Sequence, residues 1–312
     1  MKKVLLLTMI IFIVASVSAF AAYGVNWTTG FEAPKAYPGI LAPTPVGTLG
    51  QNNWQLADNP SYTDEVPMDV VAGAGRTGGN AVVARGGTGS LHNAAIRDMT
   101  TYNPGKTYYR GYAKFWVYDP GFTSTSGVDA RAGVYGALGE NNIGKMATAQ
   151  IQDASTRDPN YWYAQWSYSV GKMDGVTAVA GGAGFTFTQG LAAPRVWGAW
   201  SYTMITWVFT YTTPNVPSSG GSGVIKWFVN QSSVSPNLTL NFDSTTARWA
   251  SFHEVQGMFI GSGMTTVHNY IPNGPAKFDD IEFHADAIPE PSSLLALGTG
   301  LFGLMGLIRR RK

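Results

Sequence analysis

Hydrophobic and polar residues alternate along several stretches of the chain, which is the two-residue period of a β-strand with one buried face. The clearest stretch covers residues 108–119. Its two faces are predicted to carry Tyr109, Ala113, Phe115 and Val117 on one side and Tyr108, Arg110, Tyr112, Lys114 and Trp116 on the other.

A second alternating stretch, residues 200–211, places Ile205, Trp207 and Phe209 on one face. A polar loop at 213–221 follows it, and the chain returns as an apolar segment from residue 224 to residue 230. Two strands separated by a loop of this composition predict a long hairpin.

Shorter segments with the same period predict further strands at 80–85, 145–152, 161–170, 256–261 and 277–284. Between the two ends of the chain, no run of 12 or more residues combines a helical stripe with helix caps. Many strands with polar turns favour an all-β fold, a two-sheet antiparallel sandwich of the jelly-roll type. Each sheet would then bury one face, and the outer face of one sheet is free to hold a ligand.

The N-terminus combines Lys2 and Lys3, an apolar run from Val4 to Val17, and Ala19-Phe20-Ala21 as an A-x-A cleavage site. This arrangement is typical of a secretory signal peptide, and the run is shorter than the roughly 20 residues of a membrane-spanning helix. We expect residues 1–21 to form a signal peptide helix that the Sec translocon and signal peptidase recognise.

The C-terminus contains Pro289-Glu290-Pro291, an apolar stretch from Leu294 to Ile308, and four terminal cations. The two prolines favour an exposed, extended segment to which a processing enzyme can bind. The apolar stretch predicts a short transmembrane helix, and the cations hold the end of the chain on the cytoplasmic side. These stop-transfer cations are Arg309, Arg310, Arg311 and Lys312.

These three parts, in this order, resemble the PEP-CTERM sorting signal of Gram-negative bacteria that make exopolysaccharide. The resemblance covers residues 289–312. It implies recognition by an exosortase-type membrane protease, with cleavage near Pro289-Glu290-Pro291 at a position left open. It also implies transient anchoring in the inner membrane before the chain reaches the cell surface or the extracellular matrix.

Net charge and cysteine content narrow the functional classes. The chain has 21 Lys and Arg against 19 Asp and Glu, but six of these cations and one of these acids lie in the two ends. The remaining 15 cations and 18 acids give residues 22–288 a net charge of −3. A domain with this charge has no net electrostatic attraction to the phosphates of nucleic acid, which argues against nucleic-acid binding. With 0 cysteines, the chain has neither disulfides nor thiol nucleophiles.

The order of the predicted strands resembles that of the concanavalin A-like lectin/glucanase group and related carbohydrate-binding sandwiches. Three segments carry the resemblance: Thr29-Gly30-Phe31-Glu32, the hairpin strand Lys226–Asn230, and the ending Phe278–Phe283. It spans roughly Trp27 to Ala285 and implies a single β-sandwich domain at 22–288.

In such sandwiches the first and last strands are neighbours, and acids on them often bind a structural calcium. The resemblance therefore implies a calcium site formed by Glu32 with Asp279 or Asp280 and completed by backbone carbonyls. Strand parity leaves the choice open, because Asp279 would share a face with Ile281 and Asp280 with Glu282.

Two further motifs resemble functional sites but are better explained as structural elements. Residues 73–78 match a dinucleotide-binding fingerprint, but a strand follows them at 80–85 where that motif requires a helix. Asp280 and Glu282 resemble the paired acids of a glycosidase, yet the chain lacks the Glu-x-Asp-x-Glu run of the glucanases in this fold group. No catalytic residues are predicted.

Aromatic residues on the predicted strands either pack in the core or stack on sugar rings. The candidates for one such face are Tyr108, Tyr112, Trp116, Tyr163, Trp200 and Tyr202. We expect a non-enzymatic structural or adhesive protein of the exopolysaccharide or biofilm matrix. The alternatives are a lectin-like carbohydrate-binding module and a polysaccharide hydrolase or lyase. The ligand and the oligomeric state remain open.

Overall fold

The structure of the protein is a computed structural model, in which the targeting segments at both ends lie outside the described residues. The described residues are 24–33, 36–42, 49–56, 68–84, 93–98, 108–121, 127–136, 146–153, 161–168, 186–213, 216–230, 236–245, 253–262 and 276–287.

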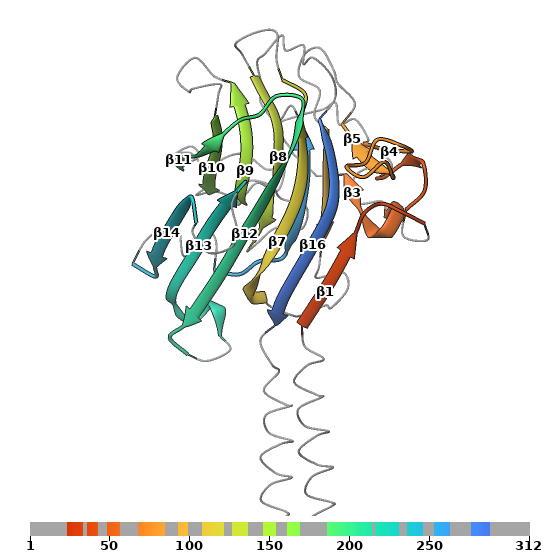
Figure 1. Ribbon diagram of the computed structural model, residues 1–312. Helices are drawn as coiled ribbons and strands as arrows, with labels where there is room; N and C mark the ends of the chain where they lie inside the picture. Colours follow the sequence, from red (N-terminus) through yellow and green to blue (C-terminus); the bar gives the residue numbers. More distant parts are fainter. Residues whose placement is uncertain are drawn as a thin grey trace, which may run out of the picture.

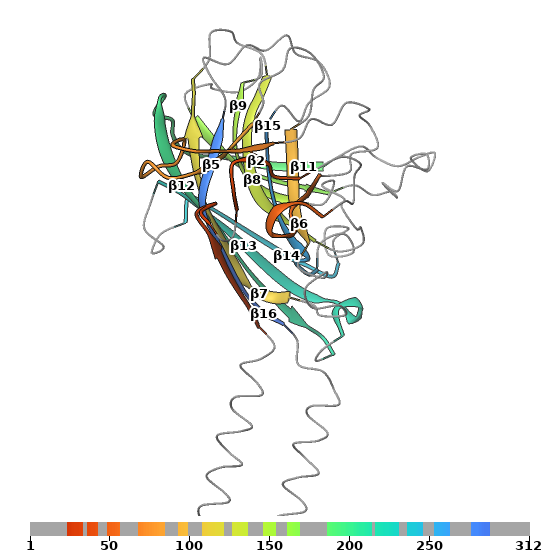
Figure 2. The same cartoon turned by 90° about the vertical axis from the view of Figure 1, so that its right-hand side faces the viewer.

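Two antiparallel sheets stack face to face in a β-sandwich, as Figures 1 and 2 show from two directions. The first sheet has the order β14-β13-β12-β7-β16-β5-β4-β2, and β1 pairs with β16 beside this path. Its strands are β1 (Gly24–Thr29), β2 (Gly39–Ile40), β4 (Asp69–Val71), β5 (Ala81–Val83), β7 (Tyr108–Asp119), β12 (Ala199–Tyr211), β13 (Gly221–Val229), β14 (Leu238–Asp243) and β16 (Lys277–Ala287).

The second sheet has the order β11-β10-β9-β8-β15-β6-β3. Its strands are β3 (Gln55–Leu56), β6 (Asn93–Asp98), β8 (Gly127–Tyr135), β9 (Met146–Asp153), β10 (Tyr161–Tyr168), β11 (Thr186–Pro194) and β15 (Gly257–Ser262). The described part of the chain also contains the short 3-10 helices η1 (Gln51–Asn53) and η2 (Pro217–Ser219). The predicted all-β sandwich is confirmed.

Alternation along β7 and β12 builds the core between the sheets. Ala113, Phe115 and Val117 of β7 are buried, as are the hydrophobic residues predicted for the inner face of β12. Four tryptophans fill the largest buried volumes: Trp54, Trp162, Trp207 and Trp227. Burial of a large apolar side chain stabilises a fold by roughly 1.5–3 kcal/mol, so the apolar area of these rings favours stacking of the two sheets.

The predicted hairpin is confirmed, because β12 and β13 pair from Thr203↔Val229 to Tyr211↔Gly221. The returning strand begins at Gly221 rather than at residue 224, so its ladder is longer than the apolar pattern indicated.

Tyr108 differs from the prediction, which placed it on the same face as Tyr112. Its side chain is buried and meets Phe283 at 6.2 Å between ring centroids. The register between β16 and β7 shifts between Asp286 and Ala287, directly opposite the start of β7. Such an irregularity changes which side of the strand faces the core.

The first and last described strands lie side by side, as the resemblance implied. β1 and β16 pair antiparallel from Gly24↔Asp286 to Thr29↔Ile281, so Gly24 and Ala287 lie at the same end of the sandwich (Figure 1). The predicted signal peptide helix (1–21) and the sorting signal (289–312), with its predicted transmembrane helix over 294–308, lie outside the described residues. Within the described ranges, no helix is long and apolar enough to cross a membrane.

Candidate functional site

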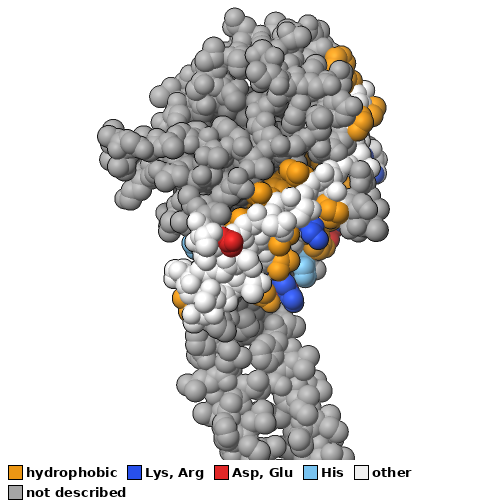
Figure 3. All heavy atoms as spheres, turned by 90° about the vertical axis from the view of Figure 1, so that its left-hand side faces the viewer, with side chains coloured by type: hydrophobic (Ala, Val, Ile, Leu, Met, Phe, Trp, Pro, Cys, Tyr) orange, Lys and Arg blue, Asp and Glu red, His pale blue; other side chains and the backbone are white. Residues whose placement is uncertain are grey.

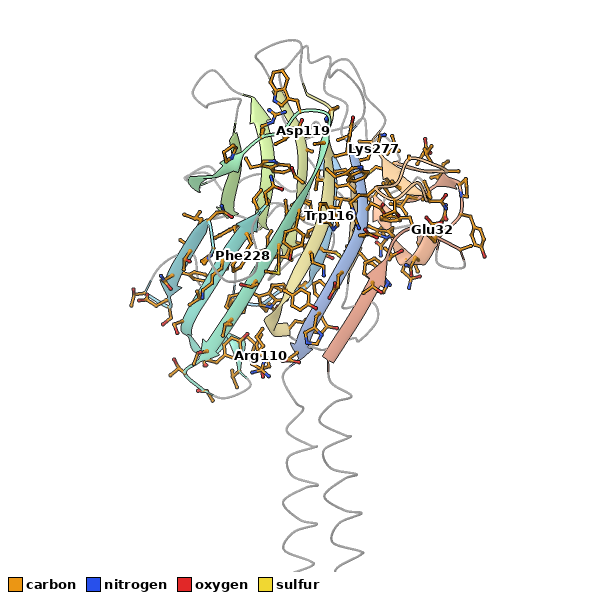
Figure 4. All side chains as sticks on the ribbon, viewed as in Figure 1. Glu32, Arg110, Trp116, Asp119, Phe228 and Lys277 are labelled. Atoms are coloured by element: carbon orange, nitrogen blue, oxygen red, sulfur yellow. The ribbon has the colours of Figure 1, made fainter. Side chains whose placement is uncertain are left out.

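A glycine-rich turn at residues 73–80 receives Glu32 from the segment that follows β1. The Thr29 hydroxyl accepts a hydrogen bond from the backbone N–H of Phe31 at 3.0 Å, and Phe31 has a φ of 60°. This bend directs Glu32 to the turn (Figure 4), where its Oε1 accepts from the backbone N–H of Asn80. The Asn80 side-chain amide in return donates to the Phe31 carbonyl at 3.0 Å.

Asp279 reaches the same turn from β16. Its Oδ2 accepts from the backbone N–H of Arg76 at 2.8 Å, and its Oδ1 accepts from the N–H of Asp280 at 2.8 Å. The side chain is buried, and this burial raises the pKa of Asp279 to about 6 against the lowering effect of those two hydrogen bonds.

Asp280 lies next to Asp279 but pairs with the side chain of Arg76 rather than with the backbone of the turn. The Arg76 guanidinium donates to its Oδ2 from Nη2 at 2.6 Å and from Nε at 3.0 Å. Asp280 has a φ of 45°, and β16 holds one extra residue opposite β7 between Asp279 and Glu282. This bulge puts Asp279 opposite Trp116, on the outer face of the sheet, so the simple parity that grouped Asp279 with Ile281 is wrong.

Oxygen atoms surround both Gly75 and Gly79 of this turn. A Cβ added at Gly75 would lie 2.7 Å from the Asn80 carbonyl, 2.9 Å from the Gly79 carbonyl and 3.0 Å from Asp279 Oδ2. A Cβ added at Gly79 would collide with Glu32 Oε1. Carboxylate and carbonyl oxygens are the ligands that calcium prefers, so the residues fit that ion. The described residues contain no group of three His, Cys, Asp or Glu side chains suited to a metal, so a calcium site here would require carbonyl ligands as well.

A second candidate site is the outer face of the first sheet, where aromatic side chains form two cross-strand rungs. Trp116 of β7 meets Tyr202 of β12 at 5.7 Å between ring centroids, and Tyr118 meets Trp200 at 5.6 Å, both edge to face. The strand register places these partners directly opposite one another. We call these four residues the aromatic rungs. All four are partly exposed to solvent.

Cations cover the β16 side of the rungs. The Arg76 guanidinium lies 4.4 Å from the centre of the Trp116 ring, and the Lys277 ammonium lies 4.7 Å from that of Tyr118. Such contacts are typical cation–π geometry. Figure 4 shows Lys277 and Trp116 on this sheet, and Figure 3 shows hydrophobic and basic side chains interspersed over the described surface.

Further along the same face, polar side chains form hydrogen bonds and an ion pair with one another. Glu282 forms an ion pair with Lys114 and accepts a hydrogen bond from the Tyr112 hydroxyl. Burial works to raise the pKa of Glu282, but the hydrogen bonds from Lys114 and Tyr112 outweigh it and lower the pKa. The Tyr112 ring stacks on His284 at 5.5 Å. Glu282 and Asp280 thus have separate partners.

Of the six aromatic residues predicted to share a face, Tyr112, Trp116, Trp200 and Tyr202 do so. The prediction is wrong for the other two: Tyr108 lies in the core, and Tyr163 belongs to β10 of the second sheet, which packs on the opposite side of the core. The prediction missed Tyr118, although it follows Trp116 by one strand period. Neither Arg76 nor Lys277 carried a sequence signal, because their ring partners are distant in the chain.

The sorting residues predicted at the C-terminus also lie outside the described residues: Pro289, Glu290, Pro291, Arg309, Arg310, Arg311 and Lys312.

Comparison with solved structures finds concanavalin A-like lectins and glycoside hydrolases among the structural neighbours. Arcelin-5, a lectin-like defense protein from Phaseolus vulgaris, is 11% identical, with 85% of this chain and 99% of that chain covered and a TM-score of 0.36. A glycoside hydrolase family 16 endo-glucanase from Bacteroides ovatus is 11% identical, with coverages of 74% and 94% and a TM-score of 0.39.

The CBM2 module of the evolved Dit of Lactobacillus casei BL23 phage J-1 is 9% identical, with coverages of 85% and 98% and a TM-score of 0.41. The assignment of the sandwich rests on the strand pairing above, and no function is drawn from these likenesses. A search of curated proteins finds no match.

One protein-family model matches the chain, that of the PEP-CTERM protein-sorting motif, over residues 287–312. The match contains the Pro-Glu-Pro tripeptide, the apolar stretch and the terminal cations. The chain therefore carries a PEP-CTERM protein-sorting motif behind its β-sandwich, which implies export, transient membrane anchoring and processing by an exosortase, a membrane protease.

Proposed function

We propose that this protein is a non-catalytic, adhesive component of the cell surface or exopolysaccharide matrix of a Gram-negative bacterium. Its sandwich would hold matrix polysaccharide on the outer face of the first sheet. The sorting motif supports the location, because it directs the chain to the envelope.

The observation that carries the proposal is the pair of aromatic rungs. Trp116, Tyr118, Trp200 and Tyr202 are partly exposed on the outer face of the first sheet, in two rungs set by the strand register. An aromatic face offers an apolar platform on which the C–H groups of a sugar ring pack. Two rungs in succession suit a polymer better than a single small molecule, because each rung can contact a different sugar of the polysaccharide.

Affinity electrophoresis of the full chain in gels that contain purified exopolysaccharide tests this proposal. We expect retardation of the wild type and a roughly tenfold weaker affinity for the Trp116→Ala/Trp200→Ala double variant, since two stacking contacts are lost. Val208→Ala is the matched control, because Val208 is 50% exposed on the same strand face but lies beyond the rungs. Equal mobility of wild type and double variant would contradict the proposal.

A dedicated carbohydrate-binding module would use the same rungs. Saturable binding of one short oligosaccharide, with a single site per chain in calorimetry, would favour that module over a matrix adhesin. Release of reducing ends or unsaturated sugars from the polysaccharide by the purified chain would instead show a hydrolase or lyase and overturn the non-catalytic assignment.

We also propose that Glu32 and Asp279, with the carbonyls of Gly79 and Asn80, hold a structural calcium ion. The buried carboxylate of Asp279 supports this, because burial disfavours its charge and a bound cation would offset that cost. The ion would tie the end of β1 and the turn at 73–80 to β16.

A further inference from the structure

The turn that joins β11 to β12 presents two large apolar side chains to solvent. Val196 is 57% exposed and Trp197 is 50% exposed, and they are adjacent in the chain. Together they form a small exposed apolar patch at this end of the sandwich.

A buried ion pair and backbone hydrogen bonds fix this turn to the end of β7. Arg195 forms a two-pronged ion pair with Asp119 at the end of β7, from Nε to Oδ2 at 2.7 Å and from Nη2 to Oδ1 at 2.7 Å. Both side chains are fully buried. Asp119 Oδ1 also accepts from the N–H of Gly121 at 2.9 Å, and the Asp119 carbonyl accepts from the N–H of Gly198 at 2.8 Å. A turn fixed in this way loses little conformational entropy when it binds a ligand.

The turn leads directly into the strand that carries Trp200. Ala199 pairs with Asp119 and Trp200 with Tyr118, so Trp197 precedes the Tyr118–Trp200 rung by only a few residues at the same end of the sheet. Lys277 lies over the Tyr118 ring at this end. Among the described residues, no carboxylate lies within ion-pair distance of its ammonium group. Figure 4 shows Lys277 and Asp119 together at this end of the sheet and Arg110 at the other.

We propose that Trp197, Trp200, Tyr118 and Lys277, here called the distal rim, bind a carboxylated polysaccharide. The aromatic side chains would contact the sugar rings, and the Lys277 ammonium would pair with a carboxylate of the polymer. Charge complementarity selects this ligand, since Lys277 is a cation beside an apolar platform. This inference rests on the proposed function and narrows its substrate class to acidic polymers such as polyuronates.

The distal rim lies at the end of the sandwich opposite Ala287, the residue at which the sorting motif begins. Lys277 pairs with Tyr118 at one end of the β16–β7 ladder, and Ala287 pairs with Tyr108 at the other. The PEP-CTERM match begins at residue 287, so an anchored chain would present the rim away from the membrane.

The test compares polygalacturonate with its carboxyl-reduced counterpart, by calorimetry on the full chain in detergent. We expect the wild type to prefer polygalacturonate, with a preference that shrinks as sodium chloride screens the charge. Lys277→Gln should weaken binding of polygalacturonate roughly twofold to fivefold and leave the reduced polymer unaffected. Trp197→Ala should weaken binding of both polymers roughly twofold to tenfold. Val208→Ala, on the same face but outside the rim, should change neither.

The outcomes separate this inference from the proposed function. A wild type that binds neither these polymers nor the exopolysaccharide would refute both. Equal affinity for the two polymers, or binding that Trp197→Ala and Lys277→Gln leave intact, would refute the distal rim alone. A dimer that Trp197→Ala dissociates, without any change in polymer binding, would assign the turn to self-association and also overturn the inference.

Discussion

Gly111 of β7 occupies a point at which two strands and a core tryptophan approach one another closely. A Cβ added there would collide with the His284 carbonyl and would lie 2.8 Å from both Ala285 Cα and Trp207 Cζ2. Two of these neighbours are backbone atoms of the paired strand, so they cannot move aside without disturbing the ladder.

Gly111→Ala should therefore destabilise the fold by roughly 1–3 kcal/mol, as overpacking does elsewhere. Urea unfolding followed by tryptophan fluorescence measures this change. Thr210→Ala, an exposed position on β12, serves as the control and should stay within about 0.5 kcal/mol of the wild type. A Gly111→Ala variant as stable as that control would show that the strands can separate here at no cost.

Tyr112 links fold stability to alkaline pH. Its hydrogen bond to Glu282, together with burial and the nearby Glu282 charge, raises its pKa from 10.0 to about 12. A raised pKa in the folded state means that the stabilisation is complete below pH 10 and is lost as the pH rises towards 12.

The stability of the wild type should consequently fall more steeply between pH 10 and pH 12 than that of Tyr112→Phe, which has no proton to lose. Urea midpoints measured across this interval report the difference. The ultraviolet titration of tyrosinate should also lose one late-titrating group in the variant. Parallel stability curves would mean that the hydrogen bond to Glu282 contributes nothing to the folded state.

At the scale of elements, the turn at 73–80 contacts all three candidate calcium ligands, but only Glu32 and Asp279 are expected to bind the ion. Added calcium should raise the melting temperature of the full chain, by an amount that corresponds to about 2.7 kcal/mol at a hundredfold excess over the dissociation constant. Glu32→Gln and Asp279→Asn should abolish the rise. Asp280→Asn should keep it, because Asp280 pairs with Arg76 instead. A wild-type melting temperature that neither calcium nor a chelator shifts would refute the site.

The Arg195–Asp119 ion pair joins the end of β7 to the turn before β12. Removal of one partner leaves a buried charge unpaired, so Arg195→Met and Asp119→Leu should each cost about 3–5 kcal/mol of unfolding free energy. The double variant Arg195→Met/Asp119→Leu should recover part of that loss, because no charge then stays buried. Denaturant unfolding of both single variants and the double variant gives the coupling energy. A loss below about 1 kcal/mol in each single variant would show that water reaches the pair.

Strand alternation predicted β7 and β12 well, because each has one face against the core along most of its length. It failed at Tyr108 and at Asp279, where the register of β16 shifts. A bulge depends on how many residues the partner strand supplies, which no local pattern encodes. For this reason the sequence left the choice between Asp279 and Asp280 open.

For the whole molecule, the two-sheet sandwich and the neighbouring first and last strands could be predicted from composition, alternation and resemblance. The distal rim could not. Arg195 and Asp119 are 76 residues apart in the chain, and nothing in either local sequence indicates their pairing. Lys277 and Tyr118 likewise meet only through the ladder between β16 and β7.

The position of Gly24 and Ala287 at one end of the sandwich also determines how the sandwich would carry mechanical load. If matrix polymer held the distal rim while the tail anchored the end of β16, tension would run lengthwise through β16 and its neighbours β7 and β1. Antiparallel ladder hydrogen bonds lie across the strand direction, so such a pull shears many of them together. Bonds that share a load resist it better than bonds that open one at a time, so β16 would act as the tension-bearing strand of the anchored protein.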